Sequence, residues 1–274
     1  MDGLRYTCAV TLNNIPLLAH PLDESSAFTP EALLEAVRVA RSLPRDPVPP
    51  ICILDFDGDL TDWLISTGAA KPWKSWACFH TTMHALEVEE TSCGIVPRTI
   101  GGPFAALIAE QLRSSGAQVI LGLTSAGRVA ASVALPSVVV ATAAIRDEGT
   151  SYHYLPAGRS AVAHATLADY LLRGLGSLGL PVLSGAVWTT DAPYRETKQQ
   201  LAEHAQQGVL AVEMQAASLF AFAAARGIPV GMVAHVTNAA DQELAAFEKG
   251  TYEFSQRLLE AMCRAAKSFL GARI

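Results

Sequence analysis

The sequence predicts an α/β protein with one central mixed sheet. Apolar, partly β-branched runs alternate with segments of helical character along most of the 274 residues, as in a domain whose helices cover a sheet. Polar clusters recur where the apolar runs end. Because open α/β sheets bind ligands at the carboxyl ends of their strands, we expect a binding site where these clusters gather.

The composition allows a large core and disfavours polyanionic partners. Half of the residues are hydrophobic and 17% are charged, so a sizeable buried core is possible. The net charge of −6 argues against a nucleic-acid or anionic-membrane partner. No apolar run approaches the roughly 20 residues of a membrane span, and no secretory signal is visible. We therefore expect a cytoplasmic protein.

Cysteine and histidine patterns give no indication of a metal site or a disulfide. His80 and His84 flank a short polar stretch without a third ligand at suitable spacing, and His235 is predicted to be a core histidine. No cofactor is expected. The cysteines are odd in number and have no C-x-x-C spacing, which predicts reduced, buried thiols: Cys8, Cys52, Cys78, Cys93 and Cys263.

Residues 1–50 are predicted to be an N-terminal extension that packs on a body formed by residues 51–274. The extension contains a helix within FTPEALLEAVRVARSLP, with Thr29 as N-cap and Pro30 at the first position. The proline-rich SLPRDPVPP then leads into the body.

The first half of the body begins with a strand at 51–54, which runs into the acidic segment Asp55-Phe-Asp57-Gly58-Asp59. Three carboxylates around a glycine at a strand end are not expected in a core. The next predicted elements are strands at 76–83 and 86–92, a helix at 104–115 that Gly101-Gly102-Pro103 opens and Gly116 closes, and a strand at 119–123. This strand ends in the small residues TSAG, either a ligand site or a tight turn.

The second half continues the alternation of strands and helices. A long polar and aromatic loop at 146–160 is predicted to bind a ligand. Asp191 or Thr190 is expected to cap the helix at 198–206, and Gly227 to end an alanine-rich helix. The predicted elements are strands at 138–145, 181–188, 209–212 and 230–236, and helices at 161–178, 198–206, 215–226 and 243–270.

Residues 209–236 read as strand, helix and strand, the unit that builds parallel sheets. Glu213 directly follows the first strand of this unit, and Thr237 and Asn238 follow the second. A carboxylate beside so much apolar surface is costly unless it is partnered or used. Glu213 is therefore either a helix cap or a functional group.

Several segments, in order, resemble the nucleoside phosphorylase/nucleosidase superfamily, which includes purine and uridine phosphorylases and methylthioadenosine nucleosidases. The similarity extends over roughly residues 51–270, and VEM between a strand and an alanine-rich helix is its most specific part. The resemblance implies a single three-layer α/β/α domain around a mixed, barrel-like sheet, assembled as a homo-oligomer (dimer, trimer or hexamer). The matching segments are GGPFAALIAEQL, TSAG, VVVATAAIRDEGTSYHYLP, WTTDAPYRE and AVEMQAASLFAFAAARGIPV.

The resemblance also implies roles for individual residues. Glu213 would lie beside the ribose, Met214 would pack under it, and Gln215 would hold the position that binds the sugar hydroxyls. Trp188 and Tyr194 would lie near the base. The nucleophile and sugar region would be formed by Thr124, Ser125, Ala126 and Gly127, with Gly58 and Asp59 at the anion loop and Asn238 at the position of the catalytic acid.

The chain departs from the family pattern where charge matters. The family usually has Glu at Gln215 and, in purine-cleaving members, an acid at Asn238; an amide delivers no proton. Asp62 and Gly122 align with two phosphate-binding arginines, so most charge partners of a phosphate dianion are missing. The cations that could replace them are Lys71, Lys74, Arg98 and Arg128.

These features favour cleavage of the N-glycosidic bond of a nucleoside-like substrate, and the missing arginines favour water over phosphate as nucleophile. The absent acid at Asn238 disfavours ordinary purine nucleosides. A phosphate-dependent enzyme of uridine phosphorylase type is an alternative, and so is a non-catalytic or repurposed relative. A third alternative is a haloacid-dehalogenase-like phosphatase, because ILDFDGDLTD resembles its first motif, with Asp55 as nucleophile, Asp57 as acid/base and Mg²⁺ as cofactor.

Overall fold

The computed structural model describes residues 15–19, 21–240 and 248–273. Within these ranges one mixed sheet contains all ten strands. They are β1 (Ile51–Asp55), β2 (Lys71–Pro72), β3 (His84–Val88), β4 (Thr91–Pro97), β5 (Val119–Arg128), β6 (Ser137–Asp147), β7 (Ser160–Val162), β8 (Val182–Thr190), β9 (Ala211–Glu213) and β10 (Val230–Ala239).

Five of these strands close into a barrel. The sheet runs in the order β10-β6-β8-β9-β5-β1-β4-β3-β2, and β10 pairs with β5 as well. The extra pairing joins the two ends of the segment from β10 to β5, so β1, β4, β3 and β2 continue as an open sheet, and the short β7 pairs with β6 outside this order. This agrees with the mixed, barrel-like sheet that the family resemblance implies.

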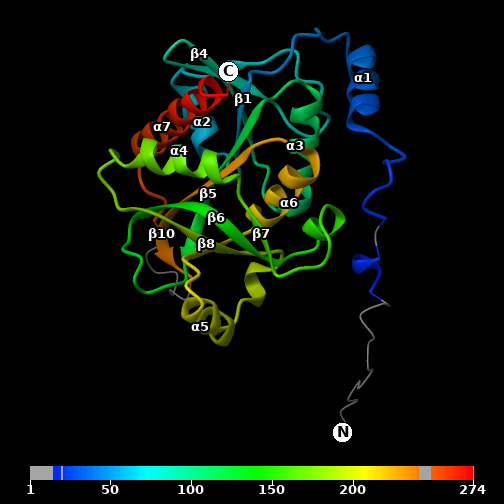
Figure 1. Ribbon diagram of the computed structural model, residues 1–274. Coiled ribbons are helices and arrows are strands. Elements are labelled where there is room, and N and C mark those ends of the chain that lie inside the picture. The colour runs from blue at the N-terminus through cyan, green and yellow to red at the C-terminus, as the bar shows by residue number, and fades with distance from the viewer. Residues whose placement is uncertain (1–14, 20, 241–247, 274) are drawn as a thin grey trace, which may run out of the picture.

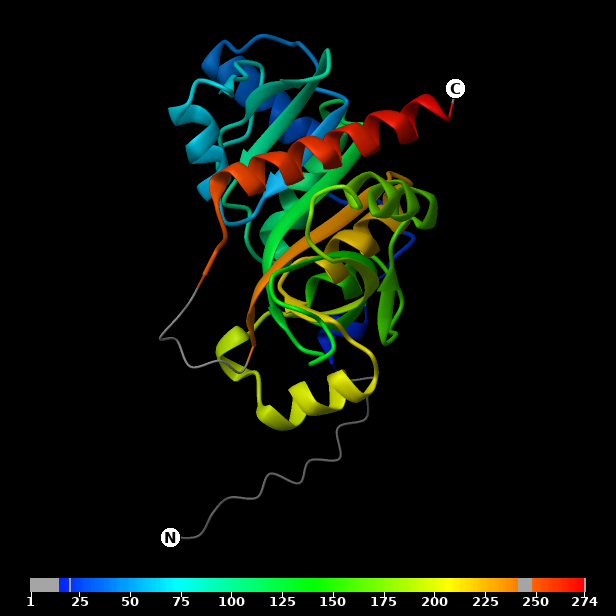
Figure 2. The ribbon, with the colours of Figure 1, turned by 90° about the vertical axis from the view of Figure 1, so that its left-hand side faces the viewer.

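Helices cover both faces of the sheet (Figures 1 and 2). α3 and α6 pack together on one side, and α4 and α7 pack together on the other. The helices of the described ranges are α1 (Pro30–Arg41), α2 (Asp59–Ser66), α3 (Gly102–Ser114), α4 (Ala165–Leu175), α5 (Lys198–Gln206), α6 (Ala216–Arg226) and α7 (Tyr252–Gly271), with short 3₁₀ turns η2 (Pro16–Leu18), η3 (Thr150–His153) and η4 (Pro193–Arg195).

The sheet and the helix layers on its two faces explain why the central strands are apolar without interruption. In β1, Ile51 and Ile53 pack into the core that includes α4 and α7. Cys52 and Leu54 point the other way, into the core that includes α3 and α6. Successive side chains of a strand alternate between faces, so a strand covered on both sides must be apolar at every position.

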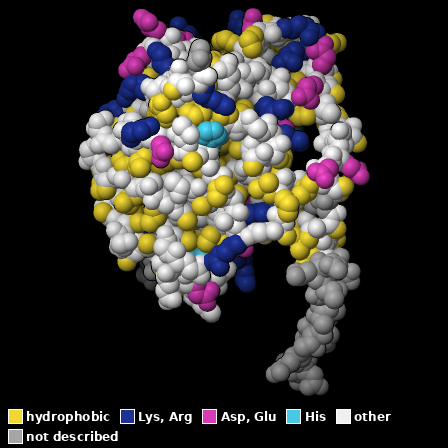
Figure 3. Space-filling model, in the orientation of Figure 1, with side chains coloured by type: hydrophobic (Ala, Val, Ile, Leu, Met, Phe, Trp, Pro, Cys, Tyr) yellow, Lys and Arg dark blue, Asp and Glu magenta, His cyan; other side chains and the backbone are white. Residues whose placement is uncertain are grey.

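The N-terminal segment contacts the body along α3. Thr29 caps α1 as predicted, accepting the N–H of Ala32 at 3.3 Å, and Ser114 of α3 donates to Glu31 at 2.6 Å. Nearer the N-terminus, the segment stands off the body (Figure 3) around a cavity of about 800 Å³. The division of the chain at residue 50 stays a prediction.

The predicted strand at 76–83 is wrong, and β4 was not predicted. Trp76, Cys78 and Met83 are buried as strand residues would be, but turn contacts hold them, such as the backbone bond from Trp76 to Trp73. β3 ends at Val88, and Glu89 and Glu90, both with positive φ, turn the chain directly into β4. One predicted strand at 86–92 therefore spans a hairpin.

The predicted parallel pairing within 209–236 is also wrong. β9 and β10 do not pair with each other; both flank β5, which is antiparallel to β9 and parallel to β10. The TSAG segment is neither a turn nor a strand end, because β5 continues through it to Arg128. Barrel closure requires this longer strand, since its second half pairs with β9 and β10.

Several helix ends differ from the prediction. The stretch predicted as one helix at 161–178 contains the end of β7 before α4 begins at Ala165. Thr197, and neither Asp191 nor Thr190, caps α5, in a reciprocal arrangement with Gln200. α7 begins at Tyr252, and the part of the predicted helix at 243–247 lies outside the described residues.

The described cysteines, Cys52, Cys78, Cys93 and Cys263, are buried and free; Cys8 lies outside the described residues. None of the helices in the described ranges has the length and apolar character to cross a membrane.

Candidate functional site

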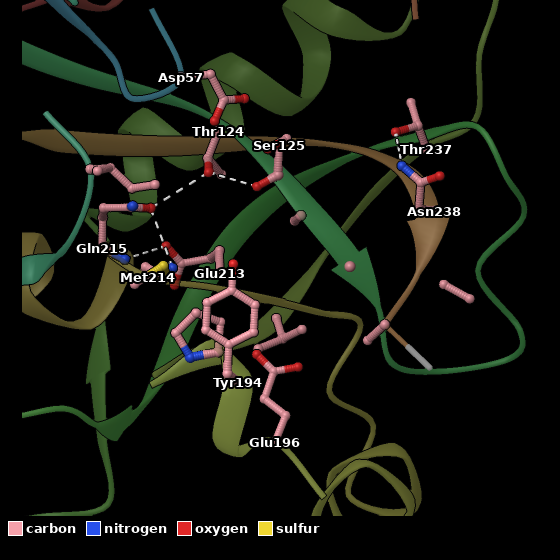
Figure 4. A pocket seen from close by; sticks show the side chains of 17 residues that line it. Asp57, Thr124, Ser125, Tyr194, Glu196, Glu213, Met214, Gln215, Thr237 and Asn238 are labelled. Carbon is pink, nitrogen blue, oxygen red and sulfur yellow. Dashed lines mark hydrogen bonds between the residues drawn. The ribbon is translucent and has the colours of Figure 1, made fainter. Parts of the chain in front are cut away.

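A cavity of about 430 Å³ opens where the second half of β5 meets the ends of β9 and β10. Figure 4 shows its polar side chains converging from these strands, from the segment after β1 and from the segment around η4. The polar side chains that line it are Asp57, Thr124, Ser125, Tyr194, Glu196, Glu213, Gln215, Thr237 and Asn238.

Glu213 is the last residue of β9 and forms part of the cavity wall while being only 5% exposed. Its Oε1 accepts the hydroxyl of Thr189, the residue paired with it in β8. Its Oε2 accepts the backbone N–H of Gln215 at 2.6 Å and of Ala216 at 2.9 Å. The two sequence interpretations are thus compatible, because this carboxylate both satisfies the start of α6 and lines the cavity.

The ionisation of Glu213 is balanced near neutral pH. Burial raises its pKa to about 7, and the charge of buried Glu148 acts in the same direction. The hydrogen bonds from Thr189, Gln215 and Ala216 oppose this rise because they favour the charged form. A group with this pKa can be charged or neutral at the pH of a cell.

The side chain of Gln215 is almost fully buried, with 1% exposed. In one orientation of the amide its oxygen accepts the N–H of Met214 at 3.3 Å. With the amide turned, Nε2 donates to Oε2 of Glu213 at 3.1 Å and the oxygen accepts the N–H of Gly101 at 3.0 Å. Nε2 then lies 3.5 Å from the hydroxyl oxygen of Thr124. Gln215 thus joins the start of α6 to the segment before α3 and to β5.

Asp57 and the hydroxyl residues of β5 line another wall of the cavity. Thr124 donates to the carbonyl oxygen of Ser125 at 2.7 Å, and Figure 4 shows Asp57 beside Thr124. Ala126 and Gly127 complete this wall. Small residues here let a ligand approach the backbone of β5.

Asn238 lines the cavity, but its amide is held by a neighbouring segment. Its Nδ2 donates to the carbonyl oxygen of Glu248 at 2.6 Å, and its Oδ1 accepts the N–H of Glu248 at 3.0 Å. Thr237 also donates to this carbonyl oxygen, at 2.5 Å. Asn238 therefore anchors residue 248 beside the end of β10.

Glu196 is a carboxylate of the cavity that sequence reasoning missed. It lies just after η4 and is half-buried, and burial raises its pKa. Within the described part of the chain its carboxylate has no hydrogen-bond or ion-pair partner. Figure 4 shows it below Tyr194, whose fully exposed ring lies over the cavity. The sequence feature that could have pointed to Glu196 is its position as an acidic residue directly before the helix cap Thr197.

Three predicted site residues do not line this cavity. Trp188 is buried, and its indole donates to Asp147 at 3.0 Å. Gly58 is covered by the side chain of Arg98. Asp59 lines a smaller neighbouring cavity of about 170 Å³, where Lys249 donates to it at 2.5 Å. His235 also lines that smaller cavity, and its ring lies tilted by 39° against Phe254, with 4.8 Å between the ring centroids.

The cations proposed as substitutes for the missing arginines lie elsewhere. Arg98 pairs with Asp62 in an exposed ion pair, Lys71 is exposed in β2, and Arg128 donates to the carbonyl oxygen of Val133 at 3.4 Å. Gly122 faces the core, since a Cβ there would lie 2.2 Å from the sulfur of Met232. Among the described residues, the cavity lining includes carboxylates but no lysine or arginine.

Asp55, the nucleophile of the phosphatase alternative, is bound by its own loop. Its Oδ1 accepts the N–H of Gly58 at 3.2 Å, and its Oδ2 accepts the N–H and the hydroxyl of Thr61 at 2.9 and 2.7 Å. It is 3% exposed, and burial raises its pKa. These contacts fix the segment before α2 and leave Asp55 poorly placed for attack on a substrate.

Comparison with known proteins agrees with the fold. Residues 50–271 match the family model described as the phosphorylase superfamily. The chain is 27% identical to uridine phosphorylase of Salmonella typhimurium over 189 residues, 64% of this chain and 75% of that protein. It is 30% identical to guanosine phosphorylase of Halorubrum lacusprofundi over 53% of this chain and 61% of that protein. It is 35% identical to a DeoD-type purine nucleoside phosphorylase of Myxococcus xanthus over 47% of this chain and 54% of that protein.

Proposed function

Because the chain belongs to the phosphorylase superfamily, we propose that it cleaves the N-glycosidic bond of a nucleoside-like substrate, with water as the nucleophile. The relatives named as uridine, guanosine and purine nucleoside phosphorylases support a nucleoside as the substrate class. The choice of water rests on the charges that line the cavity.

The observation that carries this proposal is that the cavity walls are acidic. Asp57, Glu196 and Glu213 line the cavity, whereas lysine and arginine are absent from its described lining. A phosphate dianion in such a site would meet carboxylates without guanidinium partners to offset them. Water carries no charge and does not incur this repulsion.

Glu213 is the group that we place beside the sugar. Departure of the base gives the anomeric carbon cationic character, and a nearby carboxylate stabilises that charge more in the transition state than in the ground state. Thr189 and the N–H groups at the start of α6 hold the carboxylate in a fixed position. Met214 lies next to it in the cavity lining and offers an apolar surface for the sugar ring.

Asp57 is suited to receive the proton of the attacking water. It lines the cavity beside Thr124, so water held by the hydroxyls of β5 would lie within reach of a carboxylate. A general base must be within hydrogen-bond reach of the proton that it removes. We therefore place the water on the β5 side of the cavity.

We assign to Glu196 the role of the catalytic acid, which the family resemblance places at position 238. The amide of Asn238 is occupied by Glu248, but Glu196 supplies a titratable acid in the same cavity. Burial raises its pKa, which favours a protonated carboxyl that can donate to a departing base. With this acid present, purine bases are no longer disfavoured.

Phosphorolysis is the alternative that the names of the relatives favour, and a non-catalytic relative is the other. A panel of ribo- and deoxyribonucleosides, incubated with and without phosphate, separates them. We expect base release at equal rates in both conditions, with free pentose as the second product. The Glu213→Gln variant should lose this activity while keeping its fold. Pentose 1-phosphate as the product would establish phosphorolysis, and binding without turnover would identify a non-catalytic relative.

A further inference from the structure

The small cavity of about 170 Å³ adjoins the main cavity along a shared wall. Asp57, Thr124 and Ser125 line both cavities, and they lie together on one side of the main cavity (Figure 4). A space of this size holds several waters. The side of the site on which we place the attacking water therefore continues into a space larger than one water needs.

His235 lines the small cavity with its hydrogen-bonding capacity unused. It lies in β10 opposite Ser125 of β5 and is 7% exposed. Within the described ranges its ring packs against Phe254 and has no hydrogen-bond or ion-pair partner. Burial lowers the pKa of His235, so the imidazole is neutral near pH 7 and has one N–H donor and one acceptor nitrogen. Because a buried polar group without a partner is costly, this ring indicates that the cavity takes up a hydrogen-bonding molecule.

The charges of the small cavity limit what that molecule can be. Lys249 donates to Asp59 at 2.5 Å, and these side chains are 48% and 39% exposed, so the cavity is open to solvent beside this pair. In the described lining, the carboxylates of Asp57 and Asp59 meet the single ammonium group of Lys249. Such a lining repels an anion and admits a neutral or cationic molecule. Side chains with hydroxyl groups complete it: Thr124, Ser125, Thr251, Tyr252 and Ser255.

We propose that the small cavity is an acceptor site, from which a small neutral or cationic alcohol takes the sugar in competition with water. This inference rests on the proposed function, because the nucleoside and the base Asp57 are the same. The alcohol oxygen forms a bond to C1 of the sugar while the C1–N bond breaks, and the electron pair of that bond leaves with the nucleobase. Asp57 takes the hydroxyl proton and Glu196 protonates the departing nucleobase. The products are an O-glycoside of the pentose and the free nucleobase.

The test uses three alcohols of similar size that differ in charge: ethylene glycol, ethanolamine (cationic near neutral pH) and glycolate (anionic). Each is added at equal concentration and ionic strength, without phosphate, to the full-length protein and a nucleoside. Mass spectrometry gives the ratio of O-glycoside to free pentose. Per molecule, ethylene glycol and ethanolamine should react on the order of 10-fold more often than water, as one added hydrogen bond allows. Glycolate should not exceed water.

Two variants locate the acceptor. His235→Phe keeps an aromatic ring but removes both hydrogen-bonding groups, so the preference for ethylene glycol over water should disappear at whatever rate the nucleobase is released. His80→Phe, at an exposed position outside both cavities, is the control and should keep the wild-type ratio. A wild-type ratio in His235→Phe would overturn the inference, because the alcohol would then not use the small cavity.

The outcomes separate this inference from the proposed function. Nucleobase release with no preference for any alcohol over water refutes the acceptor site and leaves hydrolysis intact. An equal preference for glycolate and ethylene glycol also refutes it, because the acidic lining would then play no part. Absence of nucleobase release from every nucleoside without phosphate refutes the acceptor site and the proposed function together.

Discussion

The hydroxyl of Thr189 donates to Glu213 across the parallel pair β8 and β9, while the same oxygen accepts the N–H of Ala217 at 2.9 Å. Since the backbone N–H occupies one side of this oxygen, the single hydroxyl proton is directed to the carboxylate. Thr189 therefore fixes the position of Glu213 and favours its ionised form. The two residues belong to different segments of the sequence, and the register between β8 and β9 brings them together.

Replacing Thr189 by Val should move the acid limb of the pH–activity profile to higher pH. The Thr189 hydrogen bond lowers the pKa of Glu213, which burial brings to about 7. Without it, the ionised form that we expect to be active appears only at higher pH. The midpoint of kcat/KM against pH measures this shift. Thr189→Ser keeps the hydroxyl and should retain the wild-type midpoint, and a Val variant with an unchanged midpoint would contradict the role of Glu213.

Glu213 should also make the stability of the protein depend on pH. Its pKa in the folded protein is raised from 4.5 to about 7, so its contribution to stability is present below pH 4.5 and is lost as the pH rises through 7. Relative to Glu213→Gln, the wild type should lose up to about 3 kcal/mol of unfolding free energy between pH 4.5 and pH 8.

Urea denaturation at several pH values measures this difference. Glu87→Gln, at an exposed position of β3, provides a matched control that should follow the wild type. A constant difference between wild type and Glu213→Gln would mean that Glu213 titrates normally in the folded protein.

Glu196→Gln should impair cleavage according to the leaving group. An amide cannot protonate a departing base, so we expect kcat for natural nucleosides to fall by about 10²- to 10⁴-fold. A 4-nitrophenyl riboside, whose leaving group needs no proton, should be cleaved by the variant at a rate close to that of the wild type. Equal losses on both substrates would indicate that Glu196 acts on the sugar or on the fold.

Gly122→Ala should lower stability, because the Cβ would lie 2.2 Å from Sδ of Met232 and 2.9 Å from Cε2 of Phe56. Overpacking of this kind costs about 1–3 kcal/mol. Gly176→Ala is the control: it has helical dihedral angles, and its nearest neighbour, the carbonyl oxygen of Arg173, lies 3.5 Å away. Thermal denaturation compares the two. A neutral Gly122→Ala would show that position 122 has free space, as an anion site would require.

Much of the fold and of the cavity could be predicted because it depends on contiguous sequence. The segment from Val209 to Asn238 shows its strand, helix and strand as uninterrupted apolar patterns, and Glu213, Met214 and Gln215 lie at a recognisable boundary. Their meeting with Thr124 and Ser125 was expected from the rule that strand ends hold the site, but these two residues lie in the middle of β5, which continues to Arg128. All of these residues line one cavity.

The remaining features depend on contacts between distant segments, which the local sequence pattern does not indicate. β4 was hidden because a turn at Glu89 and Glu90 interrupts what appears as one alternating strand. The closed barrel places β5 between β9 and β10, which local periodicity cannot indicate. Glu196 was missed because its own segment resembles a polar loop. Only the path of the chain through η4 and the start of α5 brings its carboxylate to the cavity.

The most direct test of water as the nucleophile is to run the reaction in H₂¹⁸O, with and without phosphate. A nucleoside that the enzyme cleaves is used, the sugar product is reduced with borohydride before its anomeric oxygen can exchange, and its mass is determined. We predict ¹⁸O at C1 of a free pentose, formed at the same rate whether or not phosphate is present. An unlabelled pentose 1-phosphate that forms only when phosphate is added would contradict the account.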